Sequence, residues 1–471
     1  MKLRKLSLKV DEDESYHGPA KKRNKRVANG KKYLMKIIRN TLRLYSYTTG
    51  FGLTGNTLKK GSAANYATMS FPTAPPPKSR LGRYRMLAPT AGVMVSPLCL
   101  GAMNFGEGWK ERLGECDKET SFKILDTFYE NGGNFIDTAN NYQNEDSEAW
   151  LGEWMEKRDL RDQIVLATKY TSGYRTYNKS EIQANFVGNN TKSMRLSVNA
   201  SLKKLRTDYI DLLYVHWWDF GTSIEEVMTS LNQLVIAGKV LYLGVSDTPA
   251  WVVSRANQCK KHFSKVLLEK NLLTDNKSTD ARDHGMRPFS VYQGQWNAAR
   301  RDFEREIIPM CAAEGMGLCP WGSIGGGAFK TAAHREELAK SGNPGRQIEP
   351  RDVDVAVSKV LENVANRHNT VITSVALAYV MSKAPHVFPI VGGRKVEHLL
   401  GNVEALGLEL SEEDIKEIES AYEFDPGFPN TFLFRGEEKE AHPGNVLFKN
   451  VAAKFDYVDL VRPIKPKSLD A

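Results

Sequence analysis

Cysteines are few, and long apolar runs are absent, in this chain of 471 residues. The cysteines are odd in number, scattered and without a C-x-x-C pair: Cys99, Cys116, Cys259, Cys311 and Cys319. This pattern argues against a disulfide framework or a cysteine zinc site and suits a reducing compartment. No apolar stretch approaches the roughly 20 residues that span a bilayer. We therefore expect a cytoplasmic protein with no membrane segment and no metal site.

Acidic residues are scarce at the start of the chain. Residues 1–80 hold 18 Lys/Arg and only 4 Asp/Glu, a local charge of +14, although the whole chain carries +9. The remaining residues are thus mildly acidic, at −5, and give no reason to expect binding to nucleic acid. Because residues 1–80 have little to bury, we expect them to be a separate, disordered basic extension.

Three interpretations of this extension stay open. The basic cluster Lys21–Arg26 is typical of a nuclear address. The segment Met35–Thr57 is basic, free of acids and rich in Ser/Thr, which resembles a mitochondrial transit peptide. The third interpretation, which we favour, makes Met69 the functional start and residues 1–68 an artefact of gene prediction. Beyond the extension, we expect a folded domain over residues 81–435 and a C-terminal tail over residues 436–471.

No Gly-x-Gly-x-x-Gly follows an expected strand, which speaks against a Rossmann cofactor site. Strands and helices alternate instead, after a hairpin made by Tyr84–Leu87 and Val93–Val95. The expected strands are Leu98–Gly101, a stretch ending at Asp137, a stretch ending at Lys169, Ile210–Val215, Val240–Val245, Phe289–Gln293, Gly317–Trp321 and Val387–Val391. The expected helices cover about residues 118–131, 147–157, 191–205, 224–237, 303–313, 352–366 and 371–383. This alternation predicts an α/β fold, a (β/α)8 TIM barrel with an N-terminal hairpin.

The regular alternation is interrupted over residues 259–280. A helix that begins at Pro249–Gln258 would continue naturally at Ala281–Gly285, and the intervening residues carry two lysine-rich patches without apolar periodicity. We interpret this segment as an insertion on the bottom or outside of the barrel, remote from the strand ends that carry function. Translated intron sequence is the alternative.

Reactive side chains follow three consecutive expected strands. Asp137 ends an apolar stretch, Tyr142 follows five residues later, and Lys169 and His216 end the next two strands. The carboxyl ends of barrel strands open on one face, so these four groups are expected to meet there.

Such a group of four suits the reduction of a carbonyl, which needs a proton for the developing alkoxide. A tyrosine can give it if its pKa, about 10 when free, is lowered by a neighbouring cation, and Lys169 is the candidate. Asp137 would hold the ammonium in place. A neutral His216 would donate a hydrogen bond to the substrate oxygen.

The motifs around these residues resemble the aldo-keto reductase superfamily over about residues 81–422. They are Phe135–Tyr142, Leu166–Lys169, Leu212–His216, Gly244–Asp247 and Tyr292–Gln293. Four further motifs are similar to the fungal aryl-alcohol dehydrogenase branch, which includes norsolorinic-acid-reductase-like proteins: His216–Asp219, Val291–Asn297, Cys319–Gly322 and Ile390–His398.

The resemblance implies an NADP(H) site. Ser246, Asp247 and Gln293 fall where the family holds the nicotinamide carboxamide, and Trp321 falls where an aromatic ring stacks on the nicotinamide. The phosphates would lie at the glycine loop that contains Gly322 and Gly326, and at Arg394, Lys395, His398 and Asn402. Asp247, His398 and Gly401 depart from the family pattern, in which Asn, Arg and Glu are common at these places. Arg394 and Lys395 would bind the 2′-phosphate and favour NADPH over NADH.

Aromatic residues near the strand ends predict the substrate. Trp109, Trp217 and Trp218 would stack on a flat ring, which suits an aryl aldehyde or ketone and the corresponding aryl alcohol. A role in secondary metabolism is implied by the resemblance. We expect a monomer or a homodimer.

Three other interpretations remain. The first is a cofactor-binding regulatory subunit on the same fold, similar to potassium-channel β subunits. The second is a barrel lyase that forms a Schiff base at Lys169. The third is that the insertion leaves a poorly folded protein.

Overall fold

The computed structural model describes residues 73–258, 286–341, 349–435 and 441–470. The chain divides into two units, Met1–Thr73 and Ala74–Ala471, and the fold described below is that of the second. Of the extension expected over residues 1–80, residues 1–72 lie outside the described residues, as does the insertion at residues 259–280. Residues 73–80 are described, and Ser79 Oγ donates to the carbonyl of Asn131 at 2.7 Å.

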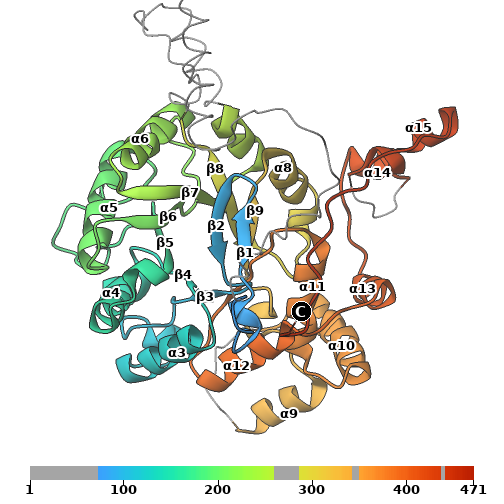
Figure 1. Ribbon diagram of the computed structural model, residues 1–471, viewed down its shortest axis with the longest axis horizontal. Helices are drawn as coiled ribbons and strands as arrows, with labels where there is room; N and C mark the ends of the chain where they lie inside the picture. The colour runs from blue at the N-terminus through green and yellow to red at the C-terminus, as the bar shows by residue number, and fades with distance from the viewer. Residues whose placement is uncertain (1–72, 259–285, 342–348, 436–440, 471) are drawn as a thin grey trace, which may run out of the picture. The chain divides into compact units, whose positions relative to one another are not determined.

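The second unit is a (β/α)8 barrel (Figure 1), as the alternation predicts. Parallel strands follow one another around the barrel in the order β10-β3-β4-β5-β6-β7-β8-β9. A parallel bridge between Leu318 and Val387, just before β10, closes the sheet between its two edge strands. The strands are β3 (Cys99–Gly101), β4 (Phe135–Asp137), β5 (Val165–Tyr170), β6 (Ile210–Val215), β7 (Val240–Ser246), β8 (Phe289–Gln295), β9 (Gly317–Trp321) and β10 (Ile390–Val391).

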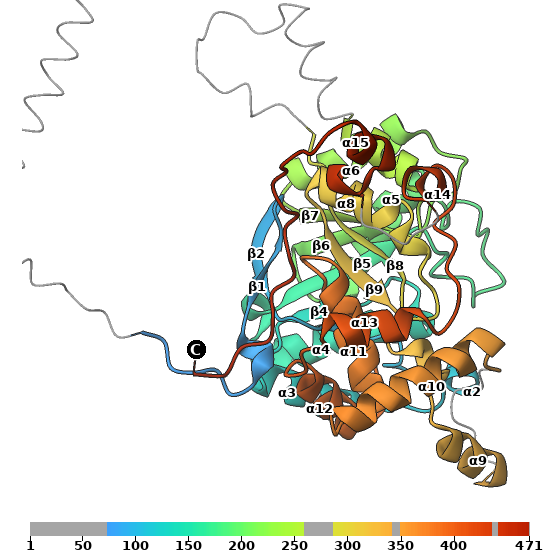
Figure 2. The same ribbon diagram turned by 90° about the vertical axis from the view of Figure 1, so that its right-hand side faces the viewer.

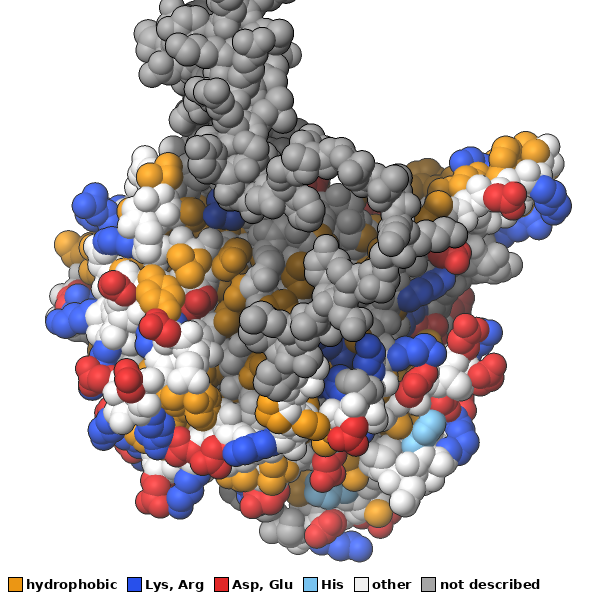
Figure 3. Space-filling view, in the orientation of Figure 1, with side chains coloured by type: hydrophobic (Ala, Val, Ile, Leu, Met, Phe, Trp, Pro, Cys, Tyr) orange, Lys and Arg blue, Asp and Glu red, His pale blue; other side chains and the backbone are white. Residues whose placement is uncertain are grey.

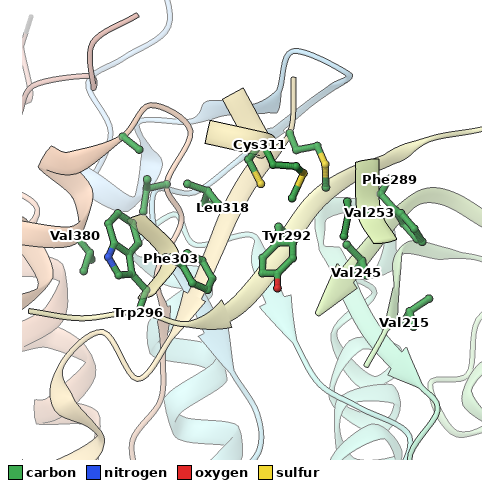
Figure 4. Packing of buried hydrophobic residues seen from close by; sticks show 14 of the residues in the cluster. Val215, Val245, Val253, Phe289, Tyr292, Trp296, Phe303, Cys311, Leu318 and Val380 are labelled. Carbon is green, nitrogen blue, oxygen red and sulfur yellow. The ribbon is translucent and has the colours of Figure 1, made fainter. Parts of the chain in front are cut away.

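Near-continuous apolar strands explain this architecture. Every residue of β4, β5 and β6 is buried, because one face of each strand fills the barrel and the other packs under helices. Figure 4 shows part of the outer layer, where Tyr292 of β8 faces Phe303 with ring centroids 5.4 Å apart. Trp296 stacks on Phe303 at 5.8 Å. Full burial of side chains of this size contributes about 1.5–3 kcal/mol each.

Helices surround the barrel (Figures 1 and 2), and side-chain caps set where several of them begin. Asp117, Asn190 and Ser223 each accept a backbone N–H three residues on, so helices start directly after them. The helices are α2 (Lys110–Leu113), α3 (Lys118–Glu130), α4 (Asp146–Arg158), α5 (Thr191–Lys204), α6 (Ile224–Ile236), α8 (Ile307–Glu314), α9 (Ala332–Ser341), α10 (Asp352–Arg367), α11 (Ile372–Lys383), α12 (Val396–Ala405), α13 (Glu412–Glu419), α14 (Asn430–Leu433) and α15 (Leu447–Ala452), and residues 250–258 are also helical.

Two expected elements are shorter than the sequence indicated. The helix expected from residue 303 begins only at Ile307, after a 3-10 turn over Asp302–Glu304. Pro309 explains this difference, because a helix from residue 303 would place its ring against the carbonyl of Arg305. The strand expected over residues 387–391 is confined to Ile390–Val391 plus the bridge at Val387.

A hairpin lies at the end of the barrel where the strands begin. Its strands β1 (Arg85–Ala88) and β2 (Ala91–Val95) are antiparallel, as expected. Thr90, in the turn, donates its backbone N–H to the carbonyl of Gly315, two residues before β9 starts. The C-terminal segment runs beside this hairpin in Figure 2, and the Arg83 guanidinium donates to the carbonyl of Ser468. The carboxyl ends of the strands therefore form the opposite, functional mouth.

Basic and acidic side chains are interspersed over the described part of the face seen in Figure 3. None of the helices in the described ranges combines the length and the apolar character needed to cross a bilayer.

Candidate active site

Neighbouring strands deliver four reactive side chains to the mouth. Asp137 is the last residue of β4, and Tyr142 begins the 3-10 turn η2 (Tyr142–Glu145) that follows. Lys169 is the penultimate residue of β5, and His216 comes directly after β6. Because β4, β5 and β6 are parallel neighbours in the sheet, all these positions lie at the mouth formed by the carboxyl ends of the strands.

The Lys169 ammonium is the centre of the group. It is fully buried and forms an ion pair with Asp137 Oδ1. It also donates to the carbonyl of Thr138 at 2.7 Å and to the Tyr142 hydroxyl at 3.4 Å. Burial on its own would lower the pKa of Lys169, but Asp137 and Tyr142 outweigh burial, and the pKa is raised. The amine is therefore a cation at neutral pH.

The second oxygen of Asp137 is also occupied. Gln293 of β8, across the barrel, donates its side-chain N–H to Asp137 Oδ2 at 3.0 Å. Gln293 and Lys169 thus hold the carboxylate from two sides. Sequence reasoning assigned Gln293 only to the cofactor, because nothing in the order of residues indicates a contact over 156 positions.

His216 is neutral at physiological pH. Burial, reinforced by the charge of Lys169, lowers the pKa of His216 from 6.5 to about 3. Its ring meets the Tyr142 ring edge to face, with centroids 5.9 Å apart. A neutral imidazole beside the phenol is what the sequence predicted for this pair.

The pKa of Tyr142 differs from the expectation. Burial is the largest effect and raises the pKa of Tyr142, Asp137 and Asp247 raise it further, and Lys169 lowers it by less than these effects together raise it. The prediction that Lys169 brings the pKa below its usual value is therefore wrong for this structure. Tyr142 remains protonated at neutral pH, which is the form a proton donor needs.

The turn after Tyr142 has an unusual backbone. Gln143, Asn144 and Glu145 all have positive φ, at 55°, 55° and 85°, a conformation that costs energy for residues other than glycine. Polar contacts hold the turn in place. Buried Gln143 accepts the backbone N–H of Trp109 at 2.7 Å and donates to Met103 O at 2.9 Å. Sequence analysis did not predict this turn.

These contacts fix Trp109 next to the phenol. The Trp109 indole N–H donates to Asn144 Oδ1 at 3.3 Å, and its ring meets Tyr142 edge to face, with centroids 6.0 Å apart. Trp109 therefore lines the mouth, as expected for a pocket wall.

Trp217 and Trp218, the other two residues expected in the substrate pocket, lie in different surroundings. Trp217 donates its indole N–H to Ser172 Oγ at 3.1 Å, and Ser172 Oγ lies 3.2 Å from His216 Nδ1. Trp218 is 7% exposed and packs in the hydrophobic core with Tyr170 and Met194. Sequence reasoning missed Ser172, which follows β5 but belongs to no motif.

Ser246 is the last residue of β7, and Asp247 follows it in a turn. Hydrogen bonds to residues of β8 hold this turn in place. Asp247 has φ 41° and donates its backbone N–H to the carbonyl of Gln293 at 3.1 Å. The Tyr292 hydroxyl donates to Thr248 O at 2.6 Å and accepts Thr248 N–H at 3.1 Å, which fixes the turn. Ser246 Oγ donates to Asp247 Oδ2 at 3.2 Å.

The Asp247 carboxyl lies beside Ser246 and Trp321. Burial raises its pKa, although hydrogen bonds from Ser246 and Trp321 act in the opposite direction. Trp321, the last residue of β9, is 37% exposed, which leaves part of its indole open to a ligand.

Glycines follow β9 directly. Gly322, Gly325, Gly326 and Gly327 all have positive φ, and the last three form the 3-10 turn η5 (Gly325–Gly327). Such a loop exposes backbone N–H groups to an anion. Lys330, just beyond it, has a pKa lowered by burial and by Arg335. Sequence reasoning did not select Lys330.

The expected phosphate ligands gather at the start of α12. Lys395 is its N-cap residue, Arg394 precedes it, and His398 lies in the first turn. Within the described residues, neither Arg394 nor Lys395 has an ion pair with a carboxylate. Burial and Lys395 lower the pKa of His398. Asn402, one turn further along α12, is buried.

The Arg394 side chain reaches toward the first strand-helix loop. A Cβ added to Gly114 would lie 1.7 Å from Arg394 Nη1, so the guanidinium occupies the space that glycine leaves. The residues present therefore fit a phosphorylated dinucleotide. At one end lie the glycine loop and the two cations, which have no carboxylate partner in the described part of the chain. At the other end lie the open indole of Trp321 and the polar turn of Ser246 and Asp247.

Comparison with known proteins agrees with this geometry. The chain is 57% identical over 390 residues to norsolorinic acid reductase B of Dothistroma septosporum, covering 81% of this chain and 94% of that protein. It is 51% identical over 399 residues to an aryl-alcohol dehydrogenase of Pestalotiopsis microspora, covering 84% and 97%. It is 47% identical over 405 residues to the aryl-alcohol dehydrogenase [NADP(+)] of Phanerodontia chrysosporium, covering 84% and 98%. A sequence model of the aldo/keto reductase family matches residues 97–423, and the chain belongs to this family.

Proposed function

We propose that the protein is an NADPH-dependent oxidoreductase that reduces aromatic aldehydes and ketones to alcohols, reversibly, in secondary metabolism. The observation that carries this proposal is the Lys169 ammonium, bonded to both Asp137 and the Tyr142 hydroxyl beside a neutral His216. These four residues are the proposed catalytic group.

Each residue has a distinct part in the reaction. The nicotinamide, when bound, supplies the hydride. Tyr142 gives its proton to the oxygen of the substrate, and the Lys169 ammonium, 3.4 Å from the phenol oxygen, stabilises the phenolate that is left. Asp137 keeps Lys169 charged and oriented. His216 donates a hydrogen bond to the substrate oxygen and so stabilises its developing charge.

For the cofactor, we infer NADPH. The proposed ligands of the nicotinamide end are Ser246, Asp247, Gln293 and Trp321. Those of the phosphates are Gly322, Gly326, Arg394, Lys395, His398 and Asn402, with Lys330 as an addition. Within the described residues, neither Arg394 nor Lys395 pairs with a carboxylate, which favours a cofactor with an extra phosphate, and the name of one relative includes NADP(+).

For the substrate, we infer a neutral aryl carbonyl compound. Trp109 and Trp217 flank the phenol and the imidazole, and large aromatic surfaces bind flat rings well. Trp218, which packs in the core, would shape the pocket only from beneath. The names of the relatives agree with this class, since two of the three compared are aryl-alcohol dehydrogenases.

The chain's organisation stays a proposal as well. We infer that residues 81–435 form the catalytic domain and that residues 436–471 are an appendage. Side chains in the described part of this tail are largely exposed, and they include Phe448, Val451, Val458 and Val461.

The test is the loss of NADPH absorbance at 340 nm with an aromatic aldehyde. We expect turnover in the wild type and a loss of at least about 100-fold in Tyr142→Phe, since a positioned proton donor contributes about 10²–10⁴-fold. Tyr129→Phe is the matched control, because within the described residues the hydroxyl of this α3 residue bonds Gln163 alone, at an exposed position. Equal rates in wild type and Tyr142→Phe would refute the acid role. Cofactor binding without turnover by the wild type would favour the regulatory subunit.

The lyase alternative is less consistent with the site. A Schiff base needs a neutral, accessible amine, whereas Lys169 is fully buried and has a raised pKa. Borohydride reduction in the presence of a carbonyl substrate separates the two chemistries. Covalent trapping of substrate on Lys169 would favour the lyase, and an unmodified lysine would favour the reductase.

A further inference from the structure

We propose that Ser172 is a positioning residue that, together with Trp217, sets the tautomer of His216 so that Nε2 carries the proton. This inference rests on the proposed function, because it specifies which nitrogen of His216 faces the substrate oxygen.

Trp217, Ser172 and His216 are joined by two hydrogen bonds, and the available donors determine the direction of each. The Trp217 indole N–H can only donate, and it lies 3.1 Å from Ser172 Oγ, so the serine oxygen is an acceptor there. Ser172 Oγ also lies 3.2 Å from His216 Nδ1. Within the described residues, the Ser172 hydroxyl has no other acceptor for its single proton. If it donates to Nδ1, the Trp217 N–H, the Ser172 hydroxyl and His216 Nδ1 all have hydrogen-bond partners.

The opposite arrangement leaves the serine proton without a partner. If Nδ1 carried the proton, Ser172 Oγ would accept both Nδ1–H and the Trp217 N–H, and its own proton would have no partner. Nε2 would then direct a lone pair at the mouth. Because Ser172 is partly buried, water compensates only in part for an unpaired hydroxyl proton there, and this tautomer is disfavoured.

The backbone around Ser172 is fixed on both sides. The preceding residue, Thr171, has φ 101°, a strained value for a β-branched residue. Asn189 compensates for this strain, because its side-chain N–H group donates to Thr171 Oγ1 at 2.9 Å and to Trp217 O at 3.0 Å. The backbone N–H of His216 donates to Tyr170 O at 3.1 Å. The ends of β5 and β6 are therefore locked together with serine, indole and imidazole in reach of one another.

The tautomer matters because the imidazole is neutral. A protonated ring would offer N–H groups on both sides, but burial keeps this ring neutral, so it carries one proton only. With that proton on Nε2, the ring donates to the oxygen that gains negative charge. With it on Nδ1, the ring would present a lone pair to that charge, and one donor of the site would be lost.

The direct test is the ¹⁵N spectrum of histidine-labelled protein with NADP+ bound. His216 is identified among the nine histidines by the missing signals of His216→Gln. We expect a protonated Nε2 and an unprotonated Nδ1 throughout pH 5–8. A protonated Nδ1 in the wild type would overturn the proposal. This readout needs no turnover, so it is independent of whether the proposed reaction occurs.

The kinetic test is a double-mutant cycle. We expect Ser172→Ala to lower kcat about 10-fold or more with the Kd for NADPH unchanged, and Ser172→Thr, which keeps the hydroxyl, to restore most of the rate. Trp217→Phe keeps an aromatic wall but loses the indole donor. Because Trp217 acts through Ser172, the double variant should be no slower than Ser172→Ala alone.

The control for the cycle is Ser290→Ala. Ser290 is a buried serine of β8 whose hydroxyl bonds Thr90 O at 3.5 Å, in the hairpin at the opposite end of the barrel. We expect wild-type kcat for it. Additive losses in the double variant, or a wild-type rate in Ser172→Ala, would contradict the proposal.

Discussion

The buried pair Asp137–Lys169 allows stability and catalysis to be separated. Both side chains are almost fully buried, with 4% and 0% of their surfaces exposed. Removing one member of such a pair leaves an uncompensated buried charge, which costs about 3–5 kcal/mol. We expect this loss in the free energy of unfolding for Asp137→Asn and for Lys169→Met. The double variant removes both charges, so it should lose much less than the sum of the two single losses.

Catalysis should respond differently from stability. The Lys169 ammonium lies 3.4 Å from the Tyr142 oxygen, and at an effective dielectric constant of about 20 this gives about 5 kcal/mol of attraction for a phenolate. Because the proton is only partly transferred in the transition state, we expect kcat to fall about 10²–10³-fold in Lys169→Met. The double variant should be as slow as Lys169→Met, since it also lacks the ammonium.

The assays are denaturant unfolding at pH 7, followed by tryptophan fluorescence, and NADPH oxidation at 340 nm. Glu119→Gln breaks the exposed pair with Lys123 on α3 and is the matched control, with unchanged stability and rate. Wild-type stability in Asp137→Asn would refute the reasoning. So would a double variant that loses the sum of both single losses, or one that recovers the wild-type rate.

Three further predictions follow from other parts of the structure. The pKa of His216 is about 3 in the folded protein and 6.5 for an unperturbed histidine, so between these pH values only the unfolded state binds the proton. Lowering the pH from 7 to 5 should therefore reduce the free energy of unfolding by about 2 kcal/mol, measured by denaturant titration. His216→Gln should lack this contribution, and an equal slope in both proteins would contradict the assignment. Arg394→Ala should weaken NADPH binding about 10- to 100-fold in calorimetry, from the loss of charge-assisted hydrogen bonds, and leave NADH binding unchanged; equal losses for both would refute a 2′-phosphate role. Deleting Cys259–Asp280, which lies outside the described residues but connects to the start of β8, should raise Tm without lowering kcat, and a lower kcat in a folded variant would contradict its placement away from the mouth.

Most strands and helices of the barrel could be predicted from local patterns in the sequence. Strands such as Ile210–Val215 are apolar throughout, which indicates burial on both faces. Helix α5 has Met194 and Val198 on one buried face, and Asn190 caps its start. Such signals come from neighbouring residues, so a single sequence carries them. Boundaries were less certain where one residue alters the backbone, as Pro309 does at the start of α8.

Contacts between residues that are far apart in the sequence could not be predicted from it. Gln293 bonds Asp137 across the barrel, and Gln143 holds Trp109 through a left-handed turn. Neither contact leaves a pattern in the chain, because each depends on which side chains the closed barrel brings into reach. The same holds for Trp218, which lies two residues after His216 in sequence but packs in the core.

The sequence by itself determined the fold and the identity of the four reactive side chains, since parallel strands of a barrel must present the residues at their carboxyl ends on one face. Only the tertiary structure decided how those side chains behave. Burial raises the pKa of Tyr142 despite Lys169 and keeps His216 neutral, and Ser172 reaches His216 Nδ1 from the next strand. The physical reason is that proton affinity depends on solvent exclusion and on contacts across strands, and both arise only when the barrel closes.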